Sequence, residues 1–376
     1  MEVYLDNAAT TRVCTEAADI AYKVMTECYG NPSSTHTKGR EAKTYLDAAR
    51  AQIAKALGCA VTEVYFTSCG SESDVWAITK GAESMSRRGK HIISSAVEHD
   101  AVRKTLADLE SRGYEVTYLK PEQDGSISVQ AVKNALRSDT VLVTLMVVNN
   151  ETGSVTDIAG IAKMLKAEGS KALLHTDAVQ GFMKLPFSAK KLGADMISIS
   201  GHKIHAPKGI GALYIKTGVK IKPLIHGGAQ VSGLRAGTEA MPQIAAFGKA
   251  AEIAFAGMKE NCDMIAKLRE SAASAICAEM PEAVIIGGGA PHILSVSLPG
   301  WRSEVLMNFL EAKGIFVSRS SACKKGGRSH VLEAMGLSAP IIDGAIRISF
   351  SRMNTQSDVD ALVSALKEAH DTLAHR

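Results

Sequence analysis

A lysine and an aspartate each stand after a strand-like apolar run. Lys203 follows the run 196–199 through a short Ser-Gly-His link, and Asp177 follows the run 172–174 earlier in the chain. A lysine amine can hold an aldehyde cofactor covalently, and a buried carboxylate can keep a pyridine nitrogen protonated so that the ring accepts electrons. This pair therefore indicates chemistry that depends on pyridoxal phosphate (PLP).

A phosphate-binding turn is indicated at residues 66–74, where a β-rich stretch passes through Gly70 into a helical pattern. Ser71, with Asp74 three residues later, is typical of a helix N-cap. The free N–H groups and the positive dipole end of a helix N-terminus attract phosphate, although Ser71 could equally only cap its helix. Because Glu72 and Asp74 would oppose an anion, we expect their side chains to point outward.

A histidine and two amides follow other strand-like runs. His99 comes after the run 91–95 and before a helical pattern, which places it at the same sheet edge as the lysine and the aspartate. Its ring could stack on a cofactor, or it could cap the helix. Asn150 and Gln180 could donate to a cofactor phenolate, but amides after strands also form turns.

The chain resembles the NifS/IscS-type cysteine desulfurases, which are fold-type I PLP enzymes of the class V aminotransferase group. The resemblance covers nearly the whole chain and is carried by seven segments: 4–11, 29–34, 98–99, 148–151, 200–203, 233–238 and 320–323.

The resemblance implies roles for the residues that match the family motifs. Lys203 would bind PLP covalently and act in catalysis, and Asp177 would pair with the pyridinium nitrogen. His99 would stack on the ring and act in catalysis, and Gln180 would donate to the phenolate oxygen. The phosphate would be held by Gly70, Ser71, Ser200, His202 and, from the other subunit of a homodimer, Thr238.

The substrate would be held and attacked by three further residues. Asn150 and Arg347 would bind the substrate carboxylate, and Asn150 would also contact the cofactor. Cys323 would accept the sulfur. Cys323 lies in a small, polar stretch, 318–329, in which Lys324 and other basic residues would favour the reactive thiolate. Without the resemblance, an incidental surface cysteine is the alternative.

Three places depart from the family pattern. Residues 69–71 read Cys-Gly-Ser where the family usually has Gly-Ala-Thr, the loop after Cys323 is about two residues shorter, and residues 230–232 read Gln-Val-Ser in place of Gln-Glu-Arg. We expect these changes to affect partner choice and sulfur transfer more than the basic chemistry. Cys69 would place an extra thiol near the cofactor.

Composition fits a globular enzyme. The 376 residues are 46% hydrophobic and 22% charged, and the net charge of +4 gives no argument for nucleic acid binding. The longest apolar run, 141–148, is far short of the ~20 residues of a membrane span. Seven cysteines without paired spacing predict a reducing cytoplasm, and His202 and His205 lack the partners that a metal site needs.

The chain alternates strand-like and helical patterns, which predicts an α/β fold with a mainly parallel, seven-stranded-type sheet. The predicted strands of the large domain are 63–67, 91–95, 141–148, 172–176, 195–199 and 210–215, and its helices are 38–57, 71–87, 100–112, 129–137 and 157–168. A smaller α+β domain follows a long helical stretch. We assign residues 14–258 to the large PLP-binding domain, and residues 1–13 with 259–376 to the small domain that carries the cysteine loop.

The expected reaction is removal of sulfur from L-cysteine, which gives L-alanine and a persulfide on Cys323. The acceptor would be an iron–sulfur scaffold protein or a tRNA-thiolating enzyme. The alternatives are a related PLP lyase or aminotransferase that acts on another amino acid, or a PLP-binding scaffold with weak desulfurase activity.

Overall fold

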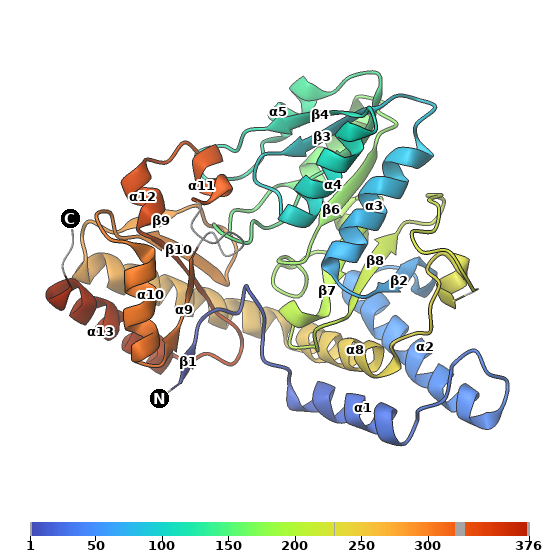
Figure 1. Cartoon of the computed structure of the whole chain (residues 1–376), viewed down its shortest axis with the longest axis horizontal. Helices are drawn as coiled ribbons and strands as arrows, with labels where there is room; N and C mark the ends of the chain where they lie inside the picture. Colours follow the sequence, from blue (N-terminus) through green and yellow to red (C-terminus); the bar gives the residue numbers. More distant parts are fainter. Residues whose placement is uncertain (1, 229, 320–327, 374–376) are drawn as a thin grey trace.

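A seven-stranded sheet forms the centre of the larger part of the molecule (Figure 1). The computed structural model describes residues 2–228, 230–319 and 328–373. The strand order is β2-β8-β7-β6-β5-β3-β4, and only β8 runs against its neighbours. The strands are β2 (Val64–Thr67), β3 (His91–Ser95), β4 (Glu115–Leu119), β5 (Thr140–Thr144), β6 (Leu173–Asp177), β7 (Met196–Ser200) and β8 (Gly211–Ile215). The predicted α/β fold with a mainly parallel sheet is confirmed.

Both faces of this sheet are buried, and all residues of the strands β5 and β7 are buried, whichever face their side chains point to. Ile92 and Met196 lie in the core beneath α3 and α4, whereas their neighbours Ile93 and Ile197 lie in the core on the opposite face. The helices of this part are α1 (Thr15–Thr26), α2 (Thr37–Leu57), α3 (Gly70–Ser84), α4 (Asp100–Ser111), α5 (Val129–Ala135), α6 (Ile158–Ala167), α7 (Ala189–Leu192) and α8 (Met241–Ala256).

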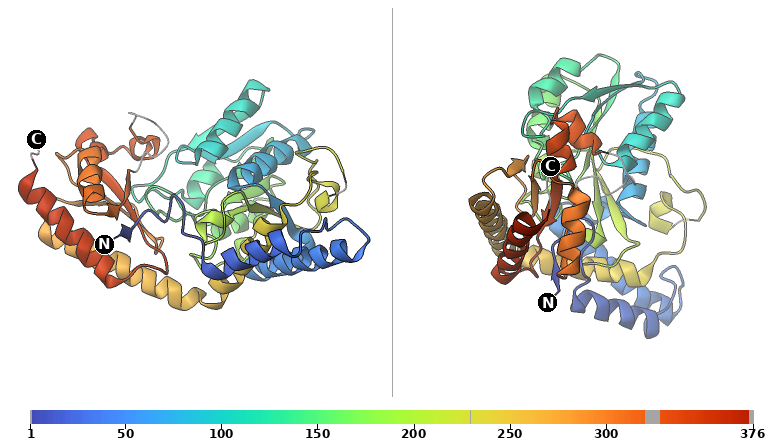
Figure 2. Two further views of the ribbon diagram at one scale, coloured as in Figure 1. Left: turned by 60° about the horizontal axis from the view of Figure 1, so that its bottom comes forward. Right: turned by 60° about the vertical axis from the view of Figure 1, so that its left-hand side comes forward.

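A second, smaller sheet has its own hydrophobic core. Its order is β12-β13-β10-β9, and all its strands are antiparallel. Its elements are α9 (Met258–Glu279), β9 (Val284–Ile286), β10 (Ile293–Ser297), α10 (Ser303–Ala312), β12 (Ser318–Arg319), α11 (His330–Ala334), α12 (Ala339–Asp343), β13 (Ala345–Ser349) and α13 (Gln356–Thr372). Figure 2 shows α8 and α9 in succession along one side of the molecule, from the larger sheet to the smaller one.

The N-terminal segment joins the two cores. Strand β1 (Val3–Tyr4) pairs in parallel with β11 (Ile315–Phe316), and Leu5 is buried in the smaller core. Three residues later Ala8 belongs to the larger core. The segment 1–13 therefore contributes to both cores, and its assignment to the small domain remains a prediction.

Several elements differ from the sequence prediction, and three of them are informative. Strand β4 and helix α1 were not expected, because β4 is an edge strand whose first four residues are only partly buried and α1 buries just Ala17, Ala21 and Val24. The predicted strand 141–148 ends at Thr144, although Leu145 and Val147 still donate to backbone oxygens of β6. No helix in the described ranges is long and apolar enough to cross a membrane.

We predict that Gly248→Ala destabilises the protein by about 1–3 kcal/mol. Gly248 lies in α8, and a Cβ there would stand 2.6 Å from the Ala49 Cα of α2, so two helix backbones would have to separate. Urea unfolding measures the loss. Gly257→Ala is the control, because its new Cβ would meet only the movable Asn261 side chain. Equal stability of the two variants would contradict this account of the helix contact.

Candidate active site

A cavity of about 340 Å³ lies at the C-terminal ends of β6 and β7. It is lined by every predicted site residue except Thr238 and Cys323. Thr238 is exposed, and Cys323 lies outside the described residues. Side chains far apart in the sequence therefore meet at the sheet edge where the sequence placed them.

Lys203 ends the single turn η2 (Gly201–Lys203), which directly follows β7. Its Nζ donates to the carbonyl oxygens of Ala8 and Ala9, at 2.6 and 2.7 Å. An ammonium group has three N–H donors, so two backbone carbonyls hold it in a fixed direction at the cavity. These two N-terminal carbonyls were not predicted, although they fall within the segment 4–11 that carries the family resemblance.

Asp177, the last residue of β6, is buried and accepts a hydrogen bond from the Val179 N–H at 2.9 Å. Burial raises the pKa of its carboxyl group, and electrostatic interactions with His99 and Lys203 oppose that rise. A cation placed beside Asp177 within the cavity would therefore favour its charged form. This environment fits a protonated pyridine nitrogen.

Asp74 corrects the sequence prediction, because its side chain is buried rather than turned outward. It lines the same cavity as Asp177, and its Oδ1 lies 3.7 Å from the Nε2 of His175. Burial and the charge of Asp177 raise the pKa of Asp74 well above its usual range. The imidazole of His175 lies between Thr144 and Ser198, and burial lowers its pKa to about 3, so it is neutral.

Glu98 is a third buried carboxyl group near the site. It accepts hydrogen bonds from Ser95 Oγ at 2.5 Å and from Met146 N at 3.3 Å. Burial raises its pKa to about 8, with the charge of Asp177 acting in the same direction and the Ser95 hydrogen bond opposing it. Glu98 is therefore mostly uncharged at neutral pH.

His99 caps α4, which confirms one of its two predicted interpretations, and its ring also lines the cavity. Its Nδ1 accepts from the Ala101 N–H at 3.1 Å. A neutral ring that accepts at Nδ1 carries its proton on Nε2. Stacking on a cofactor remains a prediction.

The turn between β2 and α3 is built around Gly70. A Cβ at this position would lie 2.7 Å from Val179 Cγ2, so any larger residue would require Val179 to move. The N-cap of α3 is Cys69, without a side-chain hydrogen bond, which makes the predicted N-cap at Ser71 wrong. Ser71 lies in the first turn of the helix and lines the cavity together with Cys69.

The surroundings of this turn suit an anion. The Ser200 Oγ is buried and has no hydrogen-bond partner in the described part of the chain. Glu72 accepts from Ser68 N at 2.8 Å and pairs with Arg235 at 2.9 Å, which neutralises its charge. Burial and Lys203 lower the pKa of His202 to about 4, so His202 is a neutral group beside Thr10.

Arg347 reaches the cavity from β13 of the smaller sheet. Its Nη1 donates to the Asn150 carbonyl at 2.7 Å, and its Nη2 pairs with Asp6 at 2.9 Å. The guanidinium is only 3% exposed, and its Nε has no partner among the described residues. This arrangement presents a fixed positive group to a carboxylate, and the role of Asp6 as its anchor was missed from the sequence.

The donor set fits PLP. Buried polar atoms in proteins are usually hydrogen-bonded, so an unpartnered Ser200 hydroxyl at the cavity is suited to a ligand oxygen. The glycine turn gives a phosphate close access to the N-terminus of α3, and Lys203 and Asp177 supply the amine and the acid.

Residues 3–362 match the family described as aminotransferase class-V. The chain is 43% identical over 371 residues to the cysteine desulfurase IscS of Methanosarcina thermophila, and the aligned residues cover 97% of this chain and 91% of that protein. It is 39% identical over 376 residues to a cysteine desulfurase of Trichormus azollae, and the aligned residues cover 99% of this chain and 93% of that protein.

The chain belongs to the class V aminotransferase family. A solved structure of a NifS-like protein superposes with a TM-score of 0.94 at 38% identity and covers 99% of this chain and all (100%) of that chain. SspA in complex with cysteine has a TM-score of 0.82 at 33% identity and covers 94% and 99% of the two chains. Because the family and these relatives depend on PLP, this chain is a PLP enzyme.

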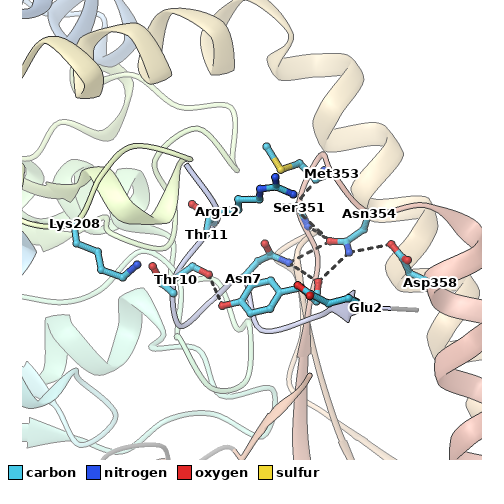
Figure 3. Close-up of a pocket in the computed structure, with 11 residues that line it drawn as sticks. Glu2, Asn7, Thr10, Thr11, Arg12, Lys208, Ser351, Met353, Asn354 and Asp358 are labelled. Atoms are coloured by element: carbon cyan, nitrogen blue, oxygen red, sulfur yellow. Dashed lines mark hydrogen bonds between the residues drawn. The ribbon is translucent and has the colours of Figure 1, made fainter. Parts of the chain in front are cut away.

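The N-terminal segment that holds Lys203 also lines a second cavity, of about 430 Å³ (Figure 3). There the Tyr4 hydroxyl donates to the Thr10 carbonyl at 2.9 Å, and Asn7 Nδ2 donates to Asn354 Oδ1 at 3.1 Å. These bonds fix the segment on both sides of Ala8 and Ala9. The geometry at Lys203 therefore depends on side chains outside the active-site cavity.

We predict that Glu98→Gln flattens the dependence of stability on pH. Because the pKa of Glu98 is about 8 in the folded protein and near ~4.3 when unfolded, the folded state binds the extra proton between these values. Stability from this group is present at low pH and falls as pH rises through that range, by up to roughly 1.4 kcal/mol per pH unit. Urea unfolding from pH 5 to 9 measures the slope.

Glutamine keeps the Glu98 side-chain acceptor and removes its titration, so the variant should gain stability over the parent as pH rises. The exposed Glu311→Gln is the matched control and should follow the parent. Parallel curves for Glu98→Gln and the parent would contradict the assignment of the high pKa.

Proposed function

We propose that this chain is a PLP-dependent cysteine desulfurase, which converts L-cysteine to L-alanine and transfers the sulfur through Cys323. The observation that carries the proposal is the meeting of Lys203, Asp177 and Arg347, which come from three separate strand regions, in one cavity. Full-length similarity to relatives named as cysteine desulfurases supports this reaction over an aminotransferase or another lyase.

Lys203 would hold PLP covalently and move the proton of the substrate Cα. PLP, when bound, supplies an electron sink for the carbon that loses this proton. Asp177 would hold a proton on the ring nitrogen, and His99 would lie against the ring. Gln180 lies in the turn that follows Asp177 at the end of β6, and its side chain would donate to the phenolate oxygen.

The phosphate would be held at the turn that opens α3. Gly70 and Ser71 would offer backbone N–H groups, and the unpartnered Ser200 hydroxyl and the neutral His202 would add hydrogen bonds. Glu72, the one acidic residue in the first turn of α3, forms an ion pair with Arg235, so its charge does not repel the phosphate.

Arg347 would bind the substrate carboxylate together with Asn150. Asp6 and the Asn150 carbonyl hold the guanidinium in place before substrate arrives, which lowers the cost of ordering it. The Cys323 thiolate would then attack the substrate sulfur: an S–S bond forms on Cys323, and the bond from sulfur to the substrate Cβ breaks. The leaving electron pair stays with the carbon skeleton that becomes alanine.

The wider context of the enzyme is part of the same proposal. We expect a homodimer, because Thr238 is exposed on its own subunit and the family resemblance directs it to the phosphate of the other. The six cysteines that the structure describes are free, which supports a reducing cytoplasm. The acceptor would be an iron–sulfur scaffold protein or a tRNA-thiolating enzyme.

We predict that Cys323→Ser lowers alanine formation from L-cysteine by a factor on the order of 100 or more while PLP remains bound. A serine hydroxyl is a far weaker nucleophile at neutral pH and cannot store a persulfide. Alanine and sulfide release under reductant are measured, and borohydride reduction with peptide mapping should place the pyridoxyl group on Lys203. Cys69→Ser is the matched control, since Cys69 is the described thiol at the cavity.

Full activity of Cys323→Ser together with loss in Cys69→Ser would move the nucleophile to the phosphate turn. A parent protein that binds PLP but leaves cysteine unchanged would favour the scaffold alternative.

We predict that two inactive variants, Lys203→Ala and Thr238→Ala, restore activity when their subunits are mixed. If each site takes Lys203 from one subunit and Thr238 from the other, one site of every mixed dimer is intact, and a random mixture should reach about a quarter of the parent rate. Lys203→Ala mixed with Asp177→Ala is the control, because each site of that dimer keeps one lesion. Equal rates in the two mixtures would show that the sites are not shared.

A further inference from the structure

The side-chain amide of Gln180 is held from two sides. Its Nε2 donates to the Ala8 carbonyl at 2.8 Å, and its Oε1 lies 3.3 Å from the Nε2 of His292. The Ala8 oxygen can only accept, so the amide nitrogen must face it and Oε1 must face His292. Gln180 is 5% exposed and lines the active-site cavity.

The partner, His292, must donate from Nε2. Its side chain is fully buried, and burial together with the charges of Lys184, Arg347 and Lys203 lowers its pKa well below the usual range. A neutral imidazole carries a single ring proton, and Gln180 Oε1 has no proton to give. The proton of His292 therefore lies on Nε2, and its Nδ1 has no partner among the described side chains and backbone.

His292 lies just before a strand of the smaller sheet, whereas Gln180 lies just after β6 of the larger one. His292 directly precedes β10, and its carbonyl accepts from the Phe350 N–H at 2.9 Å, just beyond β13. Arg347 lies on β13. The buried hydrogen bond between His292 and Gln180 thus connects the strand pair β10–β13, which carries Arg347, to the turn after β6 that lines the cavity.

We infer that His292 is a positioning residue for the cofactor: its Nε2–H fixes the Gln180 amide so that the second N–H of Gln180 is directed at the PLP phenolate oxygen. The inference rests on the proposed role of Gln180. With Ala8 as its only partner, the amide could rotate about χ3 and lose this direction. A donor held in place stabilises charge without having to reorganise when the charge forms.

The test is the visible absorption of the bound cofactor as a function of pH, together with the PLP affinity of the apoprotein. His292→Phe keeps the ring and removes the N–H, and His292→Gln restores an N–H donor at about the same reach. Loss of a donor to a phenolate disfavours the charged oxygen, so His292→Phe should raise the spectral midpoint by about one pH unit and weaken PLP binding about tenfold. His292→Gln should remain close to the parent.

A double-variant comparison separates a positioning role of His292 from a general weakening of PLP binding. In a Gln180→Leu background, His292→Phe should produce no further shift, because the group that it positions is gone. Ser297→Ala is the control: it removes a buried hydrogen bond, to the Ile341 carbonyl at 2.7 Å, from the same strand β10. It should leave the spectral midpoint unchanged.

A His292→Phe midpoint equal to that of the parent, or a full shift in the Gln180→Leu background, would overturn the inference and leave the proposed function intact. A parent protein with no cofactor band would overturn the proposed function itself. Should His292→Phe fail to fold, His292→Leu compared with His292→Gln carries the same test, with the same two outcomes.

Discussion

The cost of burying carboxyl groups governs this site. Asp177, Asp74 and Glu98 gather beneath one cavity, and burial raises the pKa of each. A buried carboxylate is stable only beside a positive charge or several donors, whereas a protonated carboxyl group carries no charge to compensate. Asp177 is the member whose pKa rise is opposed by His99 and Lys203. A positive ring nitrogen placed beside Asp177 would favour its charged form, whereas burial favours the uncharged forms of Asp74 and Glu98.

The N-terminal segment is the second constraint. Ala8 and Ala9 have almost no side chain, yet their carbonyls hold Lys203 and Gln180, the two residues proposed to act on the aldehyde carbon and on the neighbouring phenolate oxygen of the cofactor. Because these contacts are made by backbone, they depend on the path of the segment rather than on the identity of its side chains. Asn7 fixes that path by donating to the Ser349 carbonyl at 2.8 Å.

Part of this site could be predicted from the sequence because its chemistry follows local patterns. Lys203 and Asp177 stand directly after apolar runs, and in a mostly parallel sheet such positions converge at one edge. Asp74 could not be placed in this way, because an acid near the start of a helix is usually exposed and only the packing of α3 on the sheet buries it. The roles of Thr238 and Cys323 rested on the family resemblance.

The fold shows the same division between local and long-range information. Central strands are visible through short apolar segments such as 141–143 and 196–197, whereas the edge strand β4, with a mixed and partly exposed pattern, is not. His292 illustrates the limit, since nothing near it in the sequence indicates a contact with Gln180, which is 112 residues away.

The pairing of Asp6 with Arg347 spans 341 residues. On the ribosome the aspartate is therefore made long before its partner. The strands of the larger sheet all precede β13, so they can be made while the wall of the active site that Arg347 forms is still absent. A nascent chain that ends before β13 carries the larger sheet with an open catalytic centre.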